Sequence, residues 1–119
     1  MKKSKFEKRI TWQKAMDFGE VIYEMVVSFP EKEKFNLASQ ICRASDSIAP
    51  SISEGPIGQS NPEQKKLLGY SIGSFTGVVT CLFKSKRRNH VTPHTFHEIY
   101  GGAFHLMDIM GVFGKNITS

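Results

Sequence analysis

Residues 61–88 read NPEQKKLLGYSIGSFTGVVTCLFKSKRR, and their apolar spacing is that of one long helix. Asn61 is a suitable N-cap, Pro62 suits the first helical position, and Gln64 completes a capping box. Two adjacent rows of apolar residues follow at helical spacing: Leu68, Ile72, Phe75, Val79 and Leu82 in one, Leu67, Tyr70, Val78 and Cys81 in the other. This wide apolar face predicts a helix of about 26 residues, ending near Arg88, that packs against more than one neighbour.

An earlier stretch shows the same period and predicts a helix with one buried seam. Thr11 is a suitable N-cap, and Pro30 ends the helix because the residue before a proline avoids the α region. The seam consists of Trp12, Ala15, Gly19, Ile22, Val26 and Phe29. Trp12 is expected to lie in the core or to anchor an interface.

A second seam follows a short charged connector at residues 31–34, and Asn36 can cap its start. The seam consists of Leu37, Ile41, Ala44, Ile48 and Ile52. Pro50 falls inside it and should kink the helix, because proline removes one backbone hydrogen bond. Gly55 lies in the break that ends it.

The last helix is predicted to open at Thr92-Pro93 and to stop at Gly114. Its seam consists of Phe96, Ile99, Ala103, Leu106, Met110 and Phe113. Four amphipathic helices with short connections predict an all-α fold, an antiparallel up-down-up-down four-helix bundle. The expected organisation is a basic N-terminal arm at 1–9, one bundle domain at 10–116 and a tail at 117–119.

Small residues in these helices suggest close packing. Gly101-Gly102 lies in mid-helix, where each glycine costs about 1 kcal/mol relative to alanine, and a neighbouring backbone approaching closely would explain it. The glycines at 69, 73 and 77 recur every four residues and predict a tight packing face rather than a cofactor site. Cys42 and Cys81 are interpreted as small buried hydrophobes with reduced thiols.

The net charge of +5 comes from 16 Lys and Arg against 11 Asp and Glu, and most of it is concentrated in two clusters. The clusters are Lys2, Lys3, Lys5, Lys8 and Arg9, and then Lys84, Lys86, Arg87 and Arg88. With Glu7 counted, each carries +4, which leaves −3 on the rest of the chain. Such clusters can bind phosphates by counterion release. The alternative is a solvated arm and cations that complement a helix C-terminus.

No motif for catalysis or cofactor binding is present, so we expect no enzyme, no cofactor and no metal. His94 and His97 could share a helix face as metal ligands, but nothing completes a familiar spacing. Asp46 and Glu54 are a weak candidate pair for acid-base work. The least polar stretch, residues 71–83, is too short to span a bilayer, and no signal peptide follows the basic start. A cytoplasmic protein without a membrane partner is expected.

Short motifs along nearly the whole chain resemble the 23S rRNA intervening-sequence proteins, an S23-like four-helix-bundle family related to the accessory variability proteins of retroelements. They are Trp12-Gln13-Lys14-Ala15, Phe29-Pro30 with Glu33, Leu37 with Gln40, Arg43-Ala44, Ser47-Ile48, Ile52 with Glu54-Gly55, and Gly73-Ser74. The resemblance implies a bacterial, ring-like homopentamer with no catalytic residue. It also implies nucleic-acid binding through a basic surface and, for the retroelement relatives, a reverse-transcriptase partner.

The resemblance assigns a structural role to the motif residues Trp12, Gln40, Arg43, Ser47, Glu54, Gly55, Gly73 and Ser74. The sequence departs from the pattern at Ser51, Ser53, Gln59 and Gly77, where the family usually has asparagine, alanine, a basic residue and glutamate. These departures remove charged partners. The leading hypothesis is a non-enzymatic oligomeric bundle that binds RNA or DNA backbone. The alternatives are a protein scaffold, for example for a reverse transcriptase, and a metal-dependent enzyme using His94 and His97.

Overall fold

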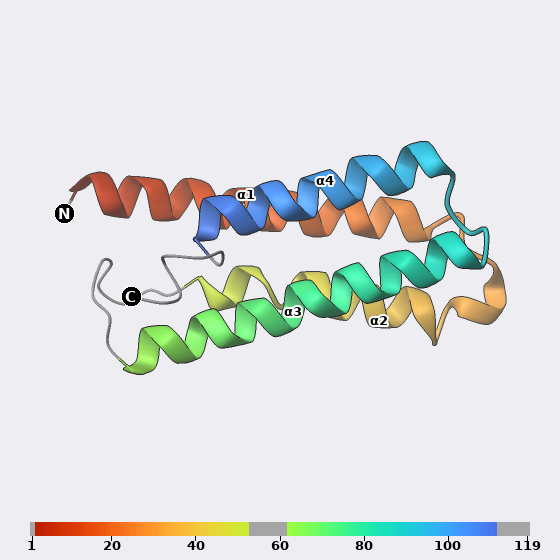
Figure 1. The fold of residues 1–119 in the computed structure, drawn as a ribbon, viewed down its shortest axis with the longest axis horizontal. Helices are drawn as coiled ribbons and strands as arrows, with labels where there is room; N and C mark the ends of the chain where they lie inside the picture. The colour runs from red at the N-terminus through yellow and green to blue at the C-terminus, as the bar shows by residue number, and fades with distance from the viewer. Residues whose placement is uncertain (1, 53–61, 112–119) are drawn as a thin grey trace.

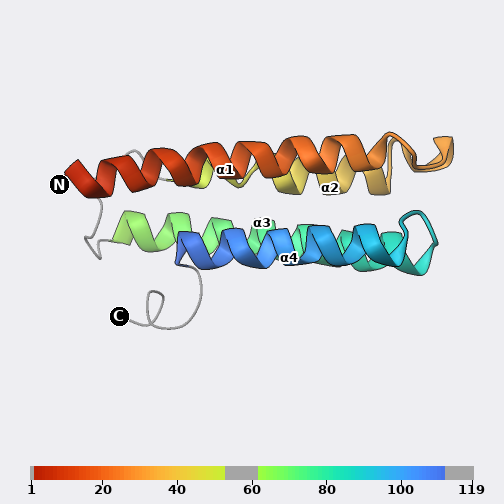
Figure 2. The same ribbon diagram turned by 90° about the horizontal axis from the view of Figure 1, so that it is seen from above.

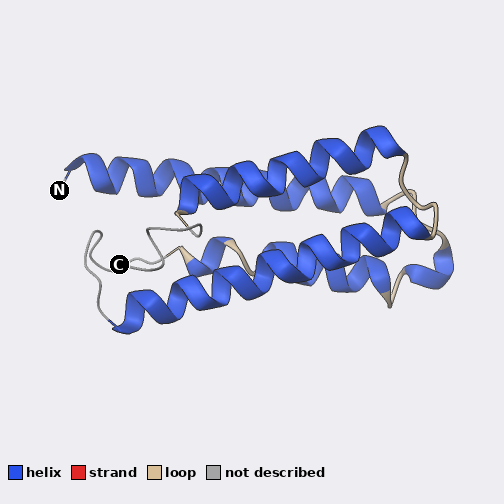
Figure 3. Cartoon of the chain, in the orientation of Figure 1, coloured by secondary structure: helices blue, strands red, loops and turns tan. Residues whose placement is uncertain are grey.

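The computed structural model describes residues 2–52 and 62–111. It contains four α-helices, α1 (Lys2–Val26), α2 (Leu37–Asp46), α3 (Pro62–Arg87) and α4 (Pro93–Met110), with short 3-10 turns η1 (Glu31–Glu33) and η2 (Ala49–Ser51). No strand occurs in these two ranges (Figure 3), and the all-α prediction is confirmed.

The helices alternate in direction, α1 and α3 running one way and α2 and α4 the other (Figure 1). Seen from above, α1 and α2 form one layer and α3 and α4 the second (Figure 2). Each helix packs along two neighbours, α1 and α3 both contacting α2 and α4. The bundle measures 46 × 23 × 23 Å and has the predicted up-down-up-down order.

Several helix ends follow from local sequence. Pro62 and Pro93 take the first helical positions, as predicted. Thr92 Oγ1 accepts the Thr95 amide at 3.1 Å, which satisfies one of the unpaired N–H groups of the first turn. Asn61 and the side chain of Gln64 lie outside the part of the chain that the structure describes.

Other ends differ from the prediction. α1 begins at Lys2, so Thr11 lies inside the helix and is not its N-cap. α4 stops at Gly111, whose φ of 71° is the left-handed conformation that glycine adopts at little cost, rather than at Gly114. Gly114 and Phe113 lie beyond the described residues.

The second predicted helix is shorter than its apolar seam. α2 ends at Asp46, and Pro50 lies in η2, where the amides of Ser51 and Ile52 donate to Ile48 and Ala49 at 3.0 Å. Because proline cannot donate to the helical ladder, the chain breaks into 3-10 turns instead of forming a kinked helix. Ile48 remains fully buried, so the seam continues through the break.

The core is largely the one predicted. The buried seam residues are Ala15, Gly19, Ile22, Phe29, Leu37, Ile41, Ile48, Phe96, Ile99, Ala103 and Leu106. Trp12 is 44% exposed, so its core interpretation is wrong.

The buried row of α3 differs from the apolar rows read in the sequence. It runs Ser71, Phe75, Val78, Leu82 and Ser85, whereas Tyr70 and Ile72 are exposed. Ser85 donates to the Cys81 carbonyl at 2.8 Å, and the Ser71 hydroxyl lies 2.5 Å from that of Ser51. These hydrogen bonds satisfy the two serine hydroxyls and so offset the free-energy cost of burying them.

Only one of the predicted glycine contacts exists. A Cβ on Gly77 would lie 3.1 Å from the Ala44 Cβ, so Gly77 lets α2 and α3 approach closely. A Cβ on Gly69, Gly73 or Gly101 would meet no atom within 4 Å, and one on Gly102 would meet only the Phe18 ring. The packing-face prediction is therefore wrong for two of the three glycines in α3, and no neighbouring backbone explains the Gly101-Gly102 pair.

Burial is the main cause that raises the pKa of both cysteine thiols. Cys81 is buried and Cys42 is partly buried, and both are free. Cys81 is therefore the small buried hydrophobe that the sequence predicted, and Cys42 is so only in part.

Candidate functional site

Glu33 is the buried centre of one end of the bundle. We call this the connector end and define it as residues 29–37 and 84–93. Glu33 Oε2 accepts from Arg88 Nη1 at 2.9 Å and lies 2.8 Å from His90 Nε2. Its Oε1 accepts the backbone amide of Leu37 at 3.4 Å and the side-chain amide of Asn36 at 3.3 Å. One carboxylate therefore ties η1 to the start of α2 and to the α3–α4 turn.

The surroundings of Glu33 keep it ionised. The hydrogen bond from His90 does most to lower the pKa of Glu33, which falls from 4.5 to about 2, with Arg88 and the Leu37 amide adding to the effect. Burial acts in the opposite direction and is outweighed. Because an ionised carboxylate only accepts hydrogen bonds, His90 Nε2 carries a proton and donates it. The His90 ring also packs on Phe29, with ring centroids 5.2 Å apart.

The side-chain cap predicted at Asn36 is wrong, and Glu33 takes that role. Asn36 occupies the N-cap position of α2, but its side chain does not bond to the helix amides. It donates to Glu33 and accepts from Gln40 Nε2 at 2.9 Å instead. The carboxylate of Glu33 serves the first turn of α2, where negative charge is favourable.

The basic cluster at the end of α3 is divided by these contacts. Arg88 is held by Glu33, although 44% of its side chain is still exposed. Lys86 Nζ lies 4.5 Å from the centroid of the Phe96 ring. Lys84 and Arg87 are exposed, and no carboxylate in the described ranges pairs with either. These two are the cations of the cluster with charge most available to a ligand.

The structure adds two cations that the sequence analysis did not single out. Lys32 and Lys34 are exposed in the connector, 52 and 50 positions before Lys84, the first residue of the α3 cluster. The bond between Glu33 and Arg88 brings the connector against the end of α3 (Figure 1). No local pattern predicts this, because the residues that join the segments, Glu33, Arg88 and His90, meet only in the folded bundle.

The N-terminal cluster lies at the opposite end of the molecule. Lys2, Lys3, Lys5, Lys8 and Arg9 belong to the first turns of α1, which extend past the end of α4 (Figures 1 and 2). The side chains of residues 2–8 are not described, and Arg9 is exposed. Within one chain the two basic clusters therefore do not form a single surface.

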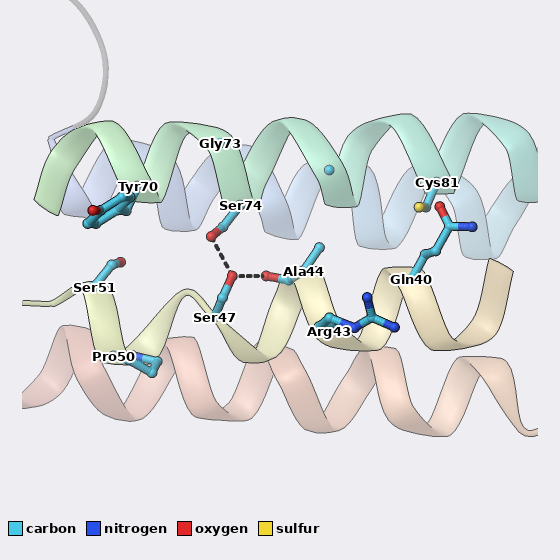
Figure 4. Close-up of a pocket in the computed structure, with 11 residues that line it drawn as sticks. Gln40, Arg43, Ala44, Ser47, Pro50, Ser51, Tyr70, Gly73, Ser74 and Cys81 are labelled. Carbon is cyan, nitrogen blue, oxygen red and sulfur yellow. Dashed lines mark hydrogen bonds between the residues drawn. The ribbon is translucent and has the colours of Figure 1, made fainter. Parts of the chain in front are cut away.

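Most of the family-motif residues line a groove of about 710 Å³ between α2 and α3 (Figure 4). A hydrogen bond between Ser47 and Ser74 joins the two helices, in line with a structural role. Gln40 and Arg43 are exposed and bond to neighbours in their own segment, Asn36 and Ser39. Glu54 and Gly55 fall outside the two described ranges, as do Ser53 and Gln59.

Two departures from the family pattern fit this groove. The Ser51 hydroxyl donates to the Ile48 carbonyl and pairs with Ser71, so it closes a polar contact between η2 and α3. A Cβ at Gly77 would lie 3.1 Å from the Ala44 Cβ, so a larger residue there would need α2 or α3 to shift by a few tenths of an ångström. Small residues at these positions therefore bring the two helices closer together.

The two remaining candidates that the structure describes in full, His94 and His97, contact residues of their own helix. His94 Nε2 pairs with Glu98 Oε2 at 3.4 Å on the exposed face of α4, and His97 contacts the Phe96 ring. In the described residues, no three His, Cys, Asp or Glu side chains are close enough to hold a metal. The pairing of Asp46 with Glu54 lies outside what the structure shows. None of the described helices is both long and apolar enough to cross a membrane.

The chain is similar to known proteins in both fold and sequence. A crystal structure from Bacteroides thetaiotaomicron, described as a protein of unknown function from the S23 ribosomal protein family, superposes with a TM-score of 0.75. That match covers 95% of this chain and 99% of the other at 17% identity, which supports the fold alone. No curated protein sequence matches. The sequence profile of the 23S rRNA-intervening sequence proteins matches residues 7–111, nearly the whole chain. The chain therefore belongs to the 23S rRNA-intervening sequence protein family.

Proposed function

We propose that this protein is a non-enzymatic, oligomeric helical bundle that binds the nucleic-acid backbone through exposed cations. The observation that carries the proposal is the charge at the connector end. Segments 31–34 and 84–88 contain six cations and two carboxylates, a net charge of +4. Glu33, one of those carboxylates, is buried and already bonded, so it offsets little of the exposed charge around it.

The N-terminal cluster supports the same proposal on separate grounds. Its five cations lie in the first turns of α1, and no acidic residue occupies the first turn. The positive end of the helix dipole makes this arrangement unfavourable by itself. A polyanion bound there would offset both the dipole and the mutual repulsion of the lysines. The name of the family, which refers to intervening sequences of 23S rRNA, agrees with a nucleic-acid ligand.

The test is the salt dependence of binding to a duplex DNA and a structured RNA, measured by fluorescence anisotropy. The plot of log K against log salt has a negative slope, and each lost phosphate contact is expected to make it less steep by about 0.9 on duplex DNA. The connector variant Lys32→Gln, Lys84→Gln, Arg87→Gln should show this loss. The control Lys14→Gln, Arg43→Gln, Lys66→Gln removes the same charge from exposed positions elsewhere. Absence of binding at low salt, or equal slopes for both variants, contradicts the proposal.

Self-association belongs to the proposal and is supported by α1. Trp12, Met16, Tyr23 and Val27 are exposed and share one face by their helical spacing. An apolar row of this kind on a surface commonly marks a protein contact. We propose that it joins copies of this chain, in a ring of five as the family resemblance implies. Light scattering that gives a monomer at micromolar concentration contradicts this part.

The same row supports one alternative function, a scaffold for another protein such as a reverse transcriptase, with no direct contact to nucleic acid. A partner that stays bound after nuclease treatment favours the scaffold. A partner lost after nuclease treatment favours nucleic-acid binding. Under the scaffold alternative, replacing Tyr23 with lysine should abolish binding of the protein partner.

A further inference from the structure

Phe35 has the largest exposed fraction of any large apolar side chain described, 87%. It lies in the turn between η1 and α2, at the connector end. Tyr23, in the last turn of α1, is also exposed, at 61%, but it lines the groove between α1 and α2. Phe83, Phe96 and Tyr100 contact each other with centroids 5.1 to 5.8 Å apart. Phe35 is thus the most exposed aromatic ring at this end, and the groove lining does not include it.

The turn that carries Phe35 is held firmly on both sides. The amides of Glu33, Lys34 and Asn36 donate to the carbonyls of Pro30, Glu31 and Glu33 at 2.9 to 3.0 Å. Glu33 is further fixed by Arg88 and His90, and Asn36 by Gln40. The ring is therefore presented from a preorganised turn, which lowers the ordering cost of binding a ligand.

One lysine lies beside the ring, and other cations lie on the same end of the bundle. Lys34 Nζ lies 5.5 Å from the centroid of the Phe35 ring, within the range of a cation–π contact. Lys32 is exposed in the same connector, and the bond between Glu33 and Arg88 brings the end of α3 alongside. An exposed ring beside a lysine, at an end of the bundle that carries further cations, is a combination that suits single-stranded nucleic acid, with bases on the ring and phosphates on the cations.

We propose that Phe35 stacks with an unpaired base and that the connector end binds single-stranded nucleic acid. This inference rests on the proposed nucleic-acid binding and narrows its ligand. A duplex can offer its backbone to Lys32, Lys84 and Arg87, but its internal bases already stack on each other. An apolar protein partner fits less well. The apolar groove at this end, between α1 and α2, includes Lys34 but not Phe35 in its lining.

The first experiment compares a labelled single-stranded oligouridylate of about ten nucleotides, a length within the usual site size, with a blunt RNA duplex of equal length. Phe35→Ala should weaken single-strand binding by about 5-fold to about 150-fold and leave duplex binding unchanged. Phe35→Trp should retain single-strand affinity. Tyr70→Ala is the matched control, because Tyr70 is also more than half exposed but lies in the first half of α3, away from its connector end.

A second readout reports stacking directly. Trp12 is the chain's one tryptophan, so the variant Trp12→Phe, Phe35→Trp has a single indole at the proposed platform. Its fluorescence should be quenched by the oligouridylate. The variant Trp12→Phe, Tyr70→Trp should show no quenching under the same conditions.

The outcomes separate this inference from the function on which it rests. Wild-type protein that binds single strands, with Phe35→Ala binding equally well, overturns the stacking platform and leaves backbone binding intact. Equal losses on single strand and duplex also overturn it. If Phe35→Ala changes the number of subunits in light scattering, Phe35 belongs to a protein interface and the inference is wrong. Wild-type protein that binds neither ligand overturns both proposals.

Discussion

The two basic clusters of this bundle carry equal net charge in the sequence but occupy different structural settings. At the connector end, Arg88 bonds to the buried Glu33 and Lys86 contacts the Phe96 ring. At the other end, the cations lie in the first turns of α1, and no acidic residue occupies its first turn. Charge density in a sequence therefore does not say how many cations are free for a ligand. The partners supplied by other segments decide that number.

Removal of Glu33 should produce the largest effect, because it disrupts one end and leaves the other intact. Glu33→Ala leaves His90 without its acceptor, Arg88 without its partner and the first turn of α2 without a carboxylate. We expect the largest drop in thermal midpoint of any single substitution named here, measured by circular dichroism. Glu31→Ala, exposed in the same turn, should change stability by less than about 0.5 kcal/mol. Equal effects of the two substitutions would show that the buried network is unimportant.

The lowered pKa of Glu33 gives this comparison a pH dependence. The folded pKa is about 2 against 4.5 for an unperturbed carboxyl, so the folded state favours the ionised form. That stabilisation is fully present above pH 4.5 and is lost as the pH falls from 4.5 towards 2. Between pH 7 and pH 3, the urea midpoint of unfolding should fall less in Glu33→Gln than in the wild type. A parallel decline in both proteins would contradict the assignment.

Adjacent arginines provide the next test. Arg88→Ala should cost about 1 kcal/mol, since a charged hydrogen bond to Glu33 is lost but the side chain is partly screened by solvent. Arg87→Ala should leave stability within about 0.5 kcal/mol. If Arg87 contacts a phosphate of a single strand, Arg87→Ala should make the slope of log K against log salt less steep by about 0.7. Chemical denaturation and anisotropy together distinguish the two roles, and a larger stability loss at Arg87 would reverse them.

The smallest effect is expected at the other end. Lys3→Glu places a negative charge in the first turn of α1, where the helix dipole favours it by roughly 0.3–1 kcal/mol. The variant should unfold at a slightly higher temperature and bind nucleic acid more weakly. Lys14→Glu, within the helix, should give no such gain in stability. A destabilised Lys3→Glu protein would mean that Lys3 already has a partner.

Local sequence was sufficient for most of the fold. The three-and-four spacing placed four helices, and Pro62 and Thr92-Pro93 placed two of their starts, because helix periodicity and capping depend on neighbours within one or two turns. α3 was the exception in its buried face. Apolar character favoured Ile72, but Ser71 and Ser85 are buried instead, since hydrogen bonds to Ser51 and Cys81 satisfy their hydroxyls.

The candidate site was only half predictable. Lys84 and Arg87 were identified from their clustering in sequence, and they are exposed as expected of binding residues. Lys32, Lys34 and Phe35 gave no comparable signal, since a short charged connector is common in soluble bundles. Glu33 belonged to a family motif, but nothing in the sequence indicated that it is buried and bonded. Their importance depends on contacts with Arg88 and His90, which lie 55 and 57 positions from Glu33.

The helical class, the up-down order and most of the core followed from the sequence, because each is set by periodic patterns and short connections along one chain segment. Only the tertiary structure decided which cations are free, which carboxylate is buried and which aromatic ring is left in solvent. The physical reason is that desolvation and ion pairing act between residues brought together by folding, whatever their separation in the chain. Glu33 illustrates both parts: it is one more charge in a polar connector until Arg88 and His90 enclose it.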